Sequence, residues 1–473
     1  MQPCKTRRPD RWVLLLACAL CSCAGYEPAP VSVADTATSF DTGTLDAARA
    51  ADTLARIAPD YEWAGDEWNA LTLFAEALSL NPELARARAA YSAALADIDA
   101  SRSRPGFTVS LAAEYSIDPP ESSNWLYGIA ADTLVDRGER RQGRIASAEI
   151  MARAAALDYA TVAWTVRQRI RQSLDAIAVG EEEIIAADAL VAARESQFET
   201  MRSRVDAGEV ARTLLDQVRA SLAESQRVRM AVRAALVRKR LDLAAAVGVA
   251  PGVIDQAGLE HFNIRDAGEL APLGSETVDA ALEGRPEILR AMLSYDRSET
   301  ELRVAVASQY PEIRLGPGYT WERGLAKLPF GLSMTFPGRD FSQATIAAAD
   351  ARRAEAGRGL EAAVSGVIAG IAGADADYRA ALAMLEVVRD ETLPTAEAIA
   401  RQADREFAAG SIDRAEWAAA QAGRHGARLD EIAAIRAVLE AEVGLEDALR
   451  LPLRGPETAV YTRMLSVDED AGR

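Results

Sequence analysis

The chain has 473 residues and a formal net charge of −18, with all four cysteines in the first 23 residues and two histidines in total. So acidic a chain offers no basic face to phosphate groups, and we expect no nucleic-acid partner. The body cannot hold a thiolate metal site, a cysteine nucleophile or a zinc site built from histidine alone, so we expect no enzyme, no metal and no cofactor.

The N-terminus has the pattern of a secretion signal. Basic residues precede an apolar stretch, Trp12–Leu20, that is shorter than the ~20 residues needed to span a bilayer. Residues 20–23 (Leu-Cys-Ser-Cys) resemble the lipobox of bacterial lipoproteins, which implies a signal peptide over 1–22 and acylation of Cys23, typically with palmitate. Cys18 ends a rival lipobox, and an ordinary cleaved signal is the third alternative. Ala24 stands where an aspartate would mark inner-membrane retention, so the resemblance points outward.

Residues 23–60 predict a tether that leads into the body, with one short helix near 45–57. The first repeat, 61–250, begins with a helical pattern that Asn81-Pro82 breaks. Apolar and polar residues then alternate in two segments, with a proline-rich turn between them. This alternation predicts a β-hairpin over 105–135.

A very long helix follows the first hairpin. Six apolar residues recur there at heptad spacing, namely Ile170, Ile177, Ile184, Val191, Phe198 and Val205. Such a series predicts a helix packed along its length, and 140–204 would reach roughly 100 Å at ~1.5 Å per residue. We expect a helical hairpin over 140–248 with its tip at 205–210, where Gly208 can adopt a positive φ.

The pattern returns after a linker at 251–275. Residues 276–450 predict a second repeat, with a β-hairpin at 311–337 and a helical hairpin at 341–449 whose tip is 408–412. A polar tail, 451–473, ends the chain. Matched positions lie about 200 residues apart, which indicates a tandem duplication.

The predicted strands are about ten residues long and carry aromatic residues near their ends, as outer-membrane barrels do. The candidates for membrane contact are Phe107, Tyr115, Trp125, Tyr127, Tyr319, Trp321, Phe330 and Phe336. A soluble four-stranded sheet with core aromatics is the alternative. Four strands cannot close a barrel and lipid does not tolerate an open sheet edge, so the membrane interpretation requires several copies.

The order of elements, the duplication, Asn81-Pro82-Glu83, Arg285-Pro286-Glu287 and the Ala-Gly tips resemble the TolC-like outer-membrane factors. The resemblance implies a mainly α fold with a membrane β part. Long helical hairpins would form a trimeric α-barrel, and four strands per chain a twelve-stranded β-barrel. Residues 315–337 resemble the heavy-metal efflux branch.

This resemblance implies a passive exit duct of a tripartite efflux or type I secretion system, lipid-anchored in the outer membrane and extending into the periplasm. Its partners would be two further copies, a periplasmic adaptor (membrane fusion) protein, an inner-membrane pump of RND or ABC type, and outer-membrane lipid. The alternative is a periplasmic lipoprotein scaffold, a coiled coil without a pore.

The resemblance also assigns roles to residues at the tips. The adaptor would contact Asp206, Ala207, Gly208, Glu209, Ala409, Gly410 and Ser411. Glu416 falls where the family's best-known member has a pore-narrowing aspartate, and is the pore-gate candidate; an ordinary solvated helix charge is the alternative. Asp413 is predicted to be a helix N-cap.

Overall fold

The structure is a computed structural model that describes residues 26–458 apart from 66, 105, 118–122, 136–137, 261–262, 269, 271–280 and 323. Cys18 and Cys23 therefore lie outside the described residues. The chain divides into two compact units after Gly43. In the first unit, Ser32 caps a helix, α2 (Val33–Asp41), so the stretch 23–60 contains a helix beyond the one that its composition predicts.

The second unit contains both repeats. The first repeat consists of α3 (Ala47–Ile57), α4 (Ala70–Leu80), α5 (Pro82–Arg102), β1 (Phe107–Tyr115), β2 (Trp125–Leu134), α6 (Glu139–Asp206) and α7 (Arg212–Val247). The break predicted at Asn81-Pro82 is confirmed. The side chain of Asn81 accepts hydrogen bonds from the backbone N–H groups of Glu83 at 2.8 Å and Leu84 at 3.2 Å. Pro82 follows in the first turn of α5, where its missing N–H costs nothing.

The same order of elements occurs again after α8 (Pro251–Gln256) and the short helix η1 (Ile264–Asp266), which lie in the predicted linker. The second repeat consists of α10 (Pro286–Ala307), β3 (Glu312–Glu322), β4 (Leu325–Lys327), β5 (Phe330–Thr335), α11 (Arg339–Val387), η2 (Val388–Thr392), α12 (Leu393–Ala408) and α13 (Arg414–Leu449). Helix, β-hairpin, long helix and return helix thus occur twice.

The sequence suggested a continuous long helix in the second repeat, but the structure shows that this helix is interrupted. A five-residue π-helical segment, η2, separates α11 from α12. Pro394 lies in the first turn of α12 and explains the interruption. Proline has no N–H to bond to the preceding turn and its ring crowds that turn's carbonyl, and the wider π-turn relieves both.

The strands form one antiparallel sheet in the order β1-β2-β3, with β4 and β5 both paired to β3. The second strand of the predicted β-hairpin 311–337 is thus divided into two segments. The register of β4, with Thr320 opposite Lys327, continues into β5, with Pro317 opposite Phe330. Pro329, which cannot donate a ladder hydrogen bond, separates the two segments of what is one strand.

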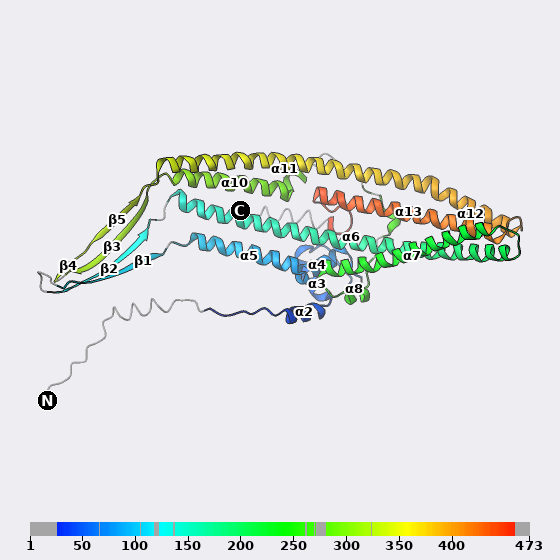
Figure 1. The fold of residues 1–473 in the computed structure, drawn as a ribbon, viewed down its shortest axis with the longest axis horizontal. Coiled ribbons are helices and arrows are strands. Elements are labelled where there is room, and N and C mark those ends of the chain that lie inside the picture. Colours follow the sequence, from blue (N-terminus) through cyan, green and yellow to red (C-terminus); the bar gives the residue numbers. More distant parts are fainter. Residues whose placement is uncertain are drawn as a thin grey trace, which may run out of the picture. The chain divides into compact units, whose positions relative to one another are not determined.

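The helices follow the order of the strands (Figure 1). Beside the sheet, packing contacts join α5 to α6, α6 to α10 and α10 to α11. Towards the far end, α7 packs on α6, α6 on α13, and α13 on α12. The second unit is therefore a layer four elements wide with two lateral edges. One edge consists of β1, α5 and α7, and the other of β4, β5, α11 and α12.

Two apolar clusters hold the layer together near its middle. One joins α4, α5, α6 and α7 and includes Leu73, Leu84, Ile170, Ile177 and Leu243. The other joins α11 to α13 and includes Ile371, Tyr378, Leu385, Ile432 and Ile435. The heptad residues Ile170, Ile177 and Val191 are buried, which confirms that α6 is packed along much of its length.

Candidate functional site

The sheet has one apolar face. Side chains alternate between the two faces of a strand, so the register fixes which residues share a face. The apolar face consists of Phe107, Val109, Leu111, Ala113 and Tyr115 of β1, alternate residues from Trp125 to Thr133 of β2 and from Ile313 to Trp321 of β3, and Ala326, Leu328, Phe330, Leu332 and Met334 of the fourth strand. It carries no charged side chain.

The opposite face carries every charged residue of the described strands, namely Glu114, Asp132, Glu312, Arg314, Glu322 and Lys327. Arg314 forms ion pairs there with Asp132 at 2.9 Å and with Glu312 at 3.2 Å. A sheet that is apolar on one face and charged on the other fits a boundary between lipid and water.

Aromatic side chains line the turn end of the apolar face. Tyr115, Trp125, Tyr127 and Trp321 contact one another in succession, with ring centroids 4.9, 5.6 and 6.1 Å apart. Seven of the eight predicted membrane aromatics are exposed, and Trp321 is half-buried. These side chains therefore do not form a core within the chain, as the alternative of a soluble sheet with core aromatics requires. Tyr319 lies inside β3, Phe330 lies in the middle of the divided fourth strand that β4 and β5 form, and Phe336 lies just after β5.

Both helical hairpins turn where Ala-Gly pairs predict. Gly208 has φ +75° and Gly410 φ +72°, so each takes the left-handed conformation that ends a helix. The predicted contact residues Asp206, Ala207, Gly208, Glu209, Ala409, Gly410 and Ser411 are all exposed. Arg204, on α6, forms ion pairs with Glu209 at 3.3 Å and with Asp413, so the two tips touch each other.

Glu416, the pore-gate candidate, has a local role in the structure. The Asp413 carboxylate accepts a hydrogen bond from the Glu416 N–H at 2.8 Å, and the Glu416 carboxylate accepts one from the Asp413 N–H at 3.3 Å. This reciprocal capping box begins α13 and confirms Asp413 as its N-cap.

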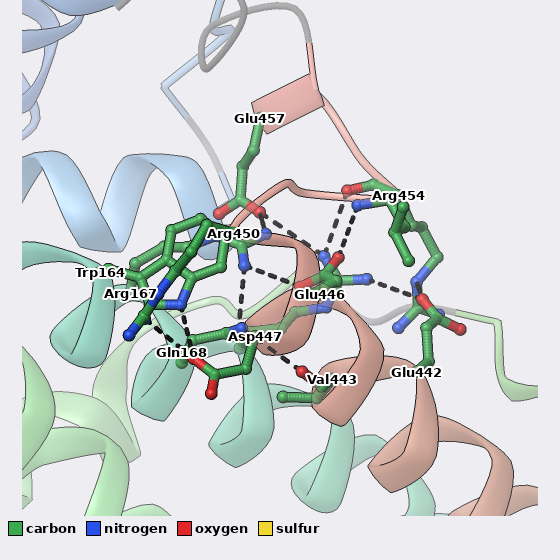
Figure 2. A network of polar contacts seen from close by, with 12 residues as sticks. Trp164, Arg167, Gln168, Glu442, Val443, Glu446, Asp447, Arg450, Arg454 and Glu457 are labelled. Carbon is green, nitrogen blue, oxygen red and sulfur yellow. Dashed lines mark hydrogen bonds and ion pairs between the residues drawn. The ribbon is translucent and has the colours of Figure 1, made fainter. Parts of the chain in front are cut away.

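A network of buried charges joins the repeats in the middle of the second unit (Figure 2). Arg167 of α6 donates to Glu446 of α13 at 2.7 Å and also pairs with Glu457 in the C-terminal segment. The Arg167 guanidinium also lies over the Trp164 ring, 5.0 Å from its centroid.

Arg171 continues the network one turn further along α6. It pairs with Asp175 at 3.1 Å, Glu442 at 3.7 Å and Glu457 at 3.7 Å. Arg454 contacts Asp175 at 3.0 Å and Glu442 at 2.8 Å. The network thereby fastens the C-terminal segment across α6 and α13.

Burial raises the pKa of Glu442 from 4.5 to about 7, although Arg454 and Arg171 oppose the rise. Asp175, Glu446 and Tyr378 also face this carboxyl group. Between these two pKa values the folded chain keeps a proton that the unfolded chain has lost. Stability must therefore fall as the pH rises through that window.

We expect the free energy of unfolding to fall by up to ~3 kcal/mol between about pH 4.5 and pH 7 on account of this one group. Urea unfolding of the detergent-solubilised protein across this range would measure the fall, and Glu442→Gln should remove it. The same slope in the variant and the original chain would contradict the assignment.

One helical stretch in the described residues, Arg339–Ala408, has the length and composition of a membrane span, with a window of mean hydropathy 1.3 that is 11% buried. Contacts with α10 and α13 place this stretch within the helical layer. Its apolar character comes mostly from alanine and glycine.

The sequence model of the outer membrane efflux protein family matches residues 73–249 and 277–449. The two matched segments correspond to the two repeats. The chain belongs to the outer membrane efflux protein family. It is thus an outer-membrane efflux channel, and the family and fold are those of a channel protein.

Solved members of this kind share the fold. The outer membrane protein VceC from Vibrio cholerae is 18% identical, with 80% of this chain and 95% of that chain covered and a TM-score of 0.65. The MtrE outer membrane channel of Neisseria gonorrhoeae is 17% identical, with coverages of 81% and 89% and a TM-score of 0.65. The CmeC outer membrane channel of Campylobacter jejuni is 13% identical, with coverages of 89% and 92% and a TM-score of 0.66. A comparison with curated protein sequences gave no match.

Sequence reasoning missed the buried charge network of the efflux protein. Arg167, Arg171 and Asp175 read as ordinary helix charges, and their partners on α13 are more than 250 positions away. The available signal was their spacing. Arg167, Arg171 and Asp175 recur every four residues, which places three charges on one helix face among the apolar heptad residues.

Proposed function

We propose that this efflux protein works as a ring of three copies that forms a passive exit duct. The observation that carries the proposal is the amphipathic sheet, with its charged face, its lipid-compatible face and two open edges. Eight strands make the smallest barrels of this type, so one chain with four cannot close one. Three copies, the number that the TolC-like resemblance implies, would give twelve strands.

In this ring the apolar face contacts lipid and the charged face lines water. Cys23 is proposed to carry an acyl anchor in the same membrane. The helical layers of three copies would continue the barrel into the periplasm as an α-barrel. If the protein forms such a duct, we expect ion conductance when the purified protein is added to a planar bilayer. If it is a scaffold without a pore, we expect no conductance.

The exposed tips are proposed to dock a periplasmic adaptor that belongs to an inner-membrane pump of RND or ABC type. Two tips per copy would present six contact points in the ring. Opening would require the Arg204–Asp413 pair to separate, since it holds the two tips together. Glu416 remains the proposed gate residue, although its carboxylate is engaged in capping α13. The heavy-metal branch remains a prediction from residues 315–337.

Asparagine at both tip glycines should block docking without unfolding the hairpins. Gly208→Asn and Gly410→Asn retain the left-handed turn, which asparagine tolerates, and a Cβ there meets no atom within 4 Å. We expect adaptor cross-linking in cells to fall about tenfold, equivalent to ~1.4 kcal/mol.

Gly65→Asn is the matched control, because Gly65 also has a positive φ (+86°) and open surroundings but lies away from the tips. It should leave cross-linking intact. Undiminished cross-linking and export in the double tip variant would rule out docking at the tips.

A further inference from the structure

A pocket lies where the sheet joins the helices, lined by the end of β2, the start of α6, the end of α10 and the start of β3 (Figure 1). The volume of this junction pocket is about 900 Å³. Near the end of the ladder between β2 and β3, the Val135 N–H donates a hydrogen bond to the Ile313 carbonyl at 3.0 Å. Beyond this bond β2 leads into α6 and α10 leads into β3, and the pocket lies beside these two connections.

A second set of exposed aromatic residues lies at the same level as the junction pocket. The set occupies the helix end of the sheet, away from the aromatic residues at the turn end, and its members are 63% to 73% exposed: Phe107, Tyr310, Phe336 and Phe341. Outer-membrane barrels carry aromatic girdles at both interfaces of their apolar band. If the apolar face contacts lipid, the junction pocket, which Tyr310 also lines, lies at the depth of the lipid headgroups.

The junction pocket is continuous with the apolar face of the sheet. Val135 and Ile313 line it and belong to that face, because they continue the alternation of β2 and β3. Leu302 and Val306 add two aliphatic side chains from α10, and Val306 is 40% exposed. An acyl chain that lies on the sheet can therefore continue into the pocket without leaving apolar surroundings.

Charged groups of both signs also line the junction pocket. Arg303 of α10 has a side chain 65% exposed, and its contact with Glu299 on the same helix is long, at 3.7 Å. Arg140 is held more firmly, since it donates to the Tyr310 carbonyl at 2.7 Å and lies 4.0 Å from Glu312. Arg303 is therefore the cation that is freer to meet a ligand.

The balance of charge discriminates between lipid headgroups. The lining has two arginines and three glutamates, so its net charge is −1. A purely anionic headgroup would meet more carboxylates than guanidinium groups. A headgroup with a phosphate and a primary ammonium group satisfies both signs, because the phosphate accepts from a guanidinium and the ammonium donates up to three hydrogen bonds to carboxylates.

We propose that the junction pocket binds one phospholipid whose zwitterionic headgroup carries a primary ammonium group, as phosphatidylethanolamine does. Arg303 holds the phosphate, and Glu139 and Glu312 accept hydrogen bonds from the ammonium group. The proposal rests on the lipid contact proposed above for the apolar face. α6 and α10 are the inner elements of the layer, so contacts between copies at its two lateral edges leave the pocket open.

Photolabelling tests the site in the full-length protein, reconstituted into phosphatidylglycerol vesicles. The vesicles contain a small fraction of phosphatidylethanolamine with a diazirine on one acyl chain, close to the glycerol. After irradiation, mass spectrometry of peptides locates the adducts. We expect them on residues 134–140 and 302–313 as well as on the apolar face of the sheet. Excess unlabelled phosphatidylethanolamine should suppress the pocket adducts, whereas further phosphatidylglycerol or inorganic phosphate should not.

Two variants of the lining test the assignment of residues. Arg303→Glu should lower the ratio of pocket adducts to sheet adducts about tenfold, the loss expected from one hydrogen bond to a charged group. Val306→Trp, which fills the apolar side of the pocket, should also lower it. Arg297→Glu is the matched control, because Arg297 is 53% exposed on α10 and pairs with Glu301 one turn away. Arg297 does not line the pocket, so the ratio should stay unchanged.

The outcomes separate the site from the proposed function. Pocket adducts that Arg303→Glu leaves unchanged, or that phosphatidylglycerol suppresses as well as phosphatidylethanolamine does, would overturn the site. Suppression by inorganic phosphate would assign the pocket to free phosphate instead. Adducts on the sheet with none in the pocket would overturn the site and retain the lipid contact of the apolar face. Adducts in neither place would refute both.

Discussion

Ile129→Arg is expected to prevent stable insertion of the efflux protein into the outer membrane. Ile129 lies in the middle of β2 on the apolar face, opposite Leu111 on one side and Tyr319 on the other. An arginine on a lipid-contacting face near the midplane costs ~2–4 kcal/mol, and the proposed ring of three copies would incur that cost three times. The measurement is the amount of heat-labile oligomer that detergent extracts from outer membranes.

Ala130→Arg is the matched control, because Ala130 is the next residue of the same strand and faces the charged side. We expect its oligomer to be recovered in nearly normal amount. Equal loss in both variants would indicate that β2 tolerates no large side chain on either face, and equal recovery would show that the apolar face does not contact lipid.

Arg171→Ala is expected to destabilise the second unit by about 3–5 kcal/mol, because truncation leaves buried carboxylates without one of their cations. Both Arg171 and its partner Asp175 have side chains 8% exposed, and Glu442 is 2% exposed. The neighbouring carboxylates hold the pKa of Arg171 above its usual value despite the opposing effect of burial, so the guanidinium is charged in the fold.

Arg169→Ala on the same helix provides the comparison. Arg169 is half exposed and pairs with Glu83 at 3.0 Å, an arrangement that contributes at most ~1 kcal/mol. Urea unfolding gives the total loss for each variant, and hydrogen exchange of residues 439–458 shows whether the C-terminal segment detaches first. An equal loss of unfolding free energy in Arg171→Ala and Arg169→Ala would contradict the stabilising role of the buried network.

The fold was accessible from the sequence because its signals are local and repeated. Heptad spacing revealed the long helices, alternation revealed the strands, and Gly208 and Gly410 marked the hairpin turns. Each of these depends on the backbone preferences of neighbouring residues, so a single sequence carries them. The charge segregation across the sheet was also present in the sequence, but only the register between strands shows that the charged residues share one face.

Features that depend on contacts between distant segments of the chain could not be predicted from the sequence. Arg167 and Glu446 meet because α13 returns along α6, and no local pattern connects them. The division of the fourth strand and the π-segment were missed for another reason. Pro329 and Pro394 each remove one hydrogen bond from a regular element. The periodic pattern of apolar residues continues on both sides of each proline, so the sequence predicted an uninterrupted strand and an uninterrupted helix.

The two open lateral edges have a consequence for how the protein is made. A single copy exposes the unpaired backbone groups of β1 and of the fourth strand, together with an apolar sheet face. Such a chain is prone to pair with any other extended segment until its partners arrive. Because assembly of the proposed ring requires several copies to meet, the waiting time lengthens steeply as the number of newly secreted chains falls. Expression level thus becomes a determinant of correct folding, and efficient biogenesis favours synthesis in bursts over a slow, steady supply.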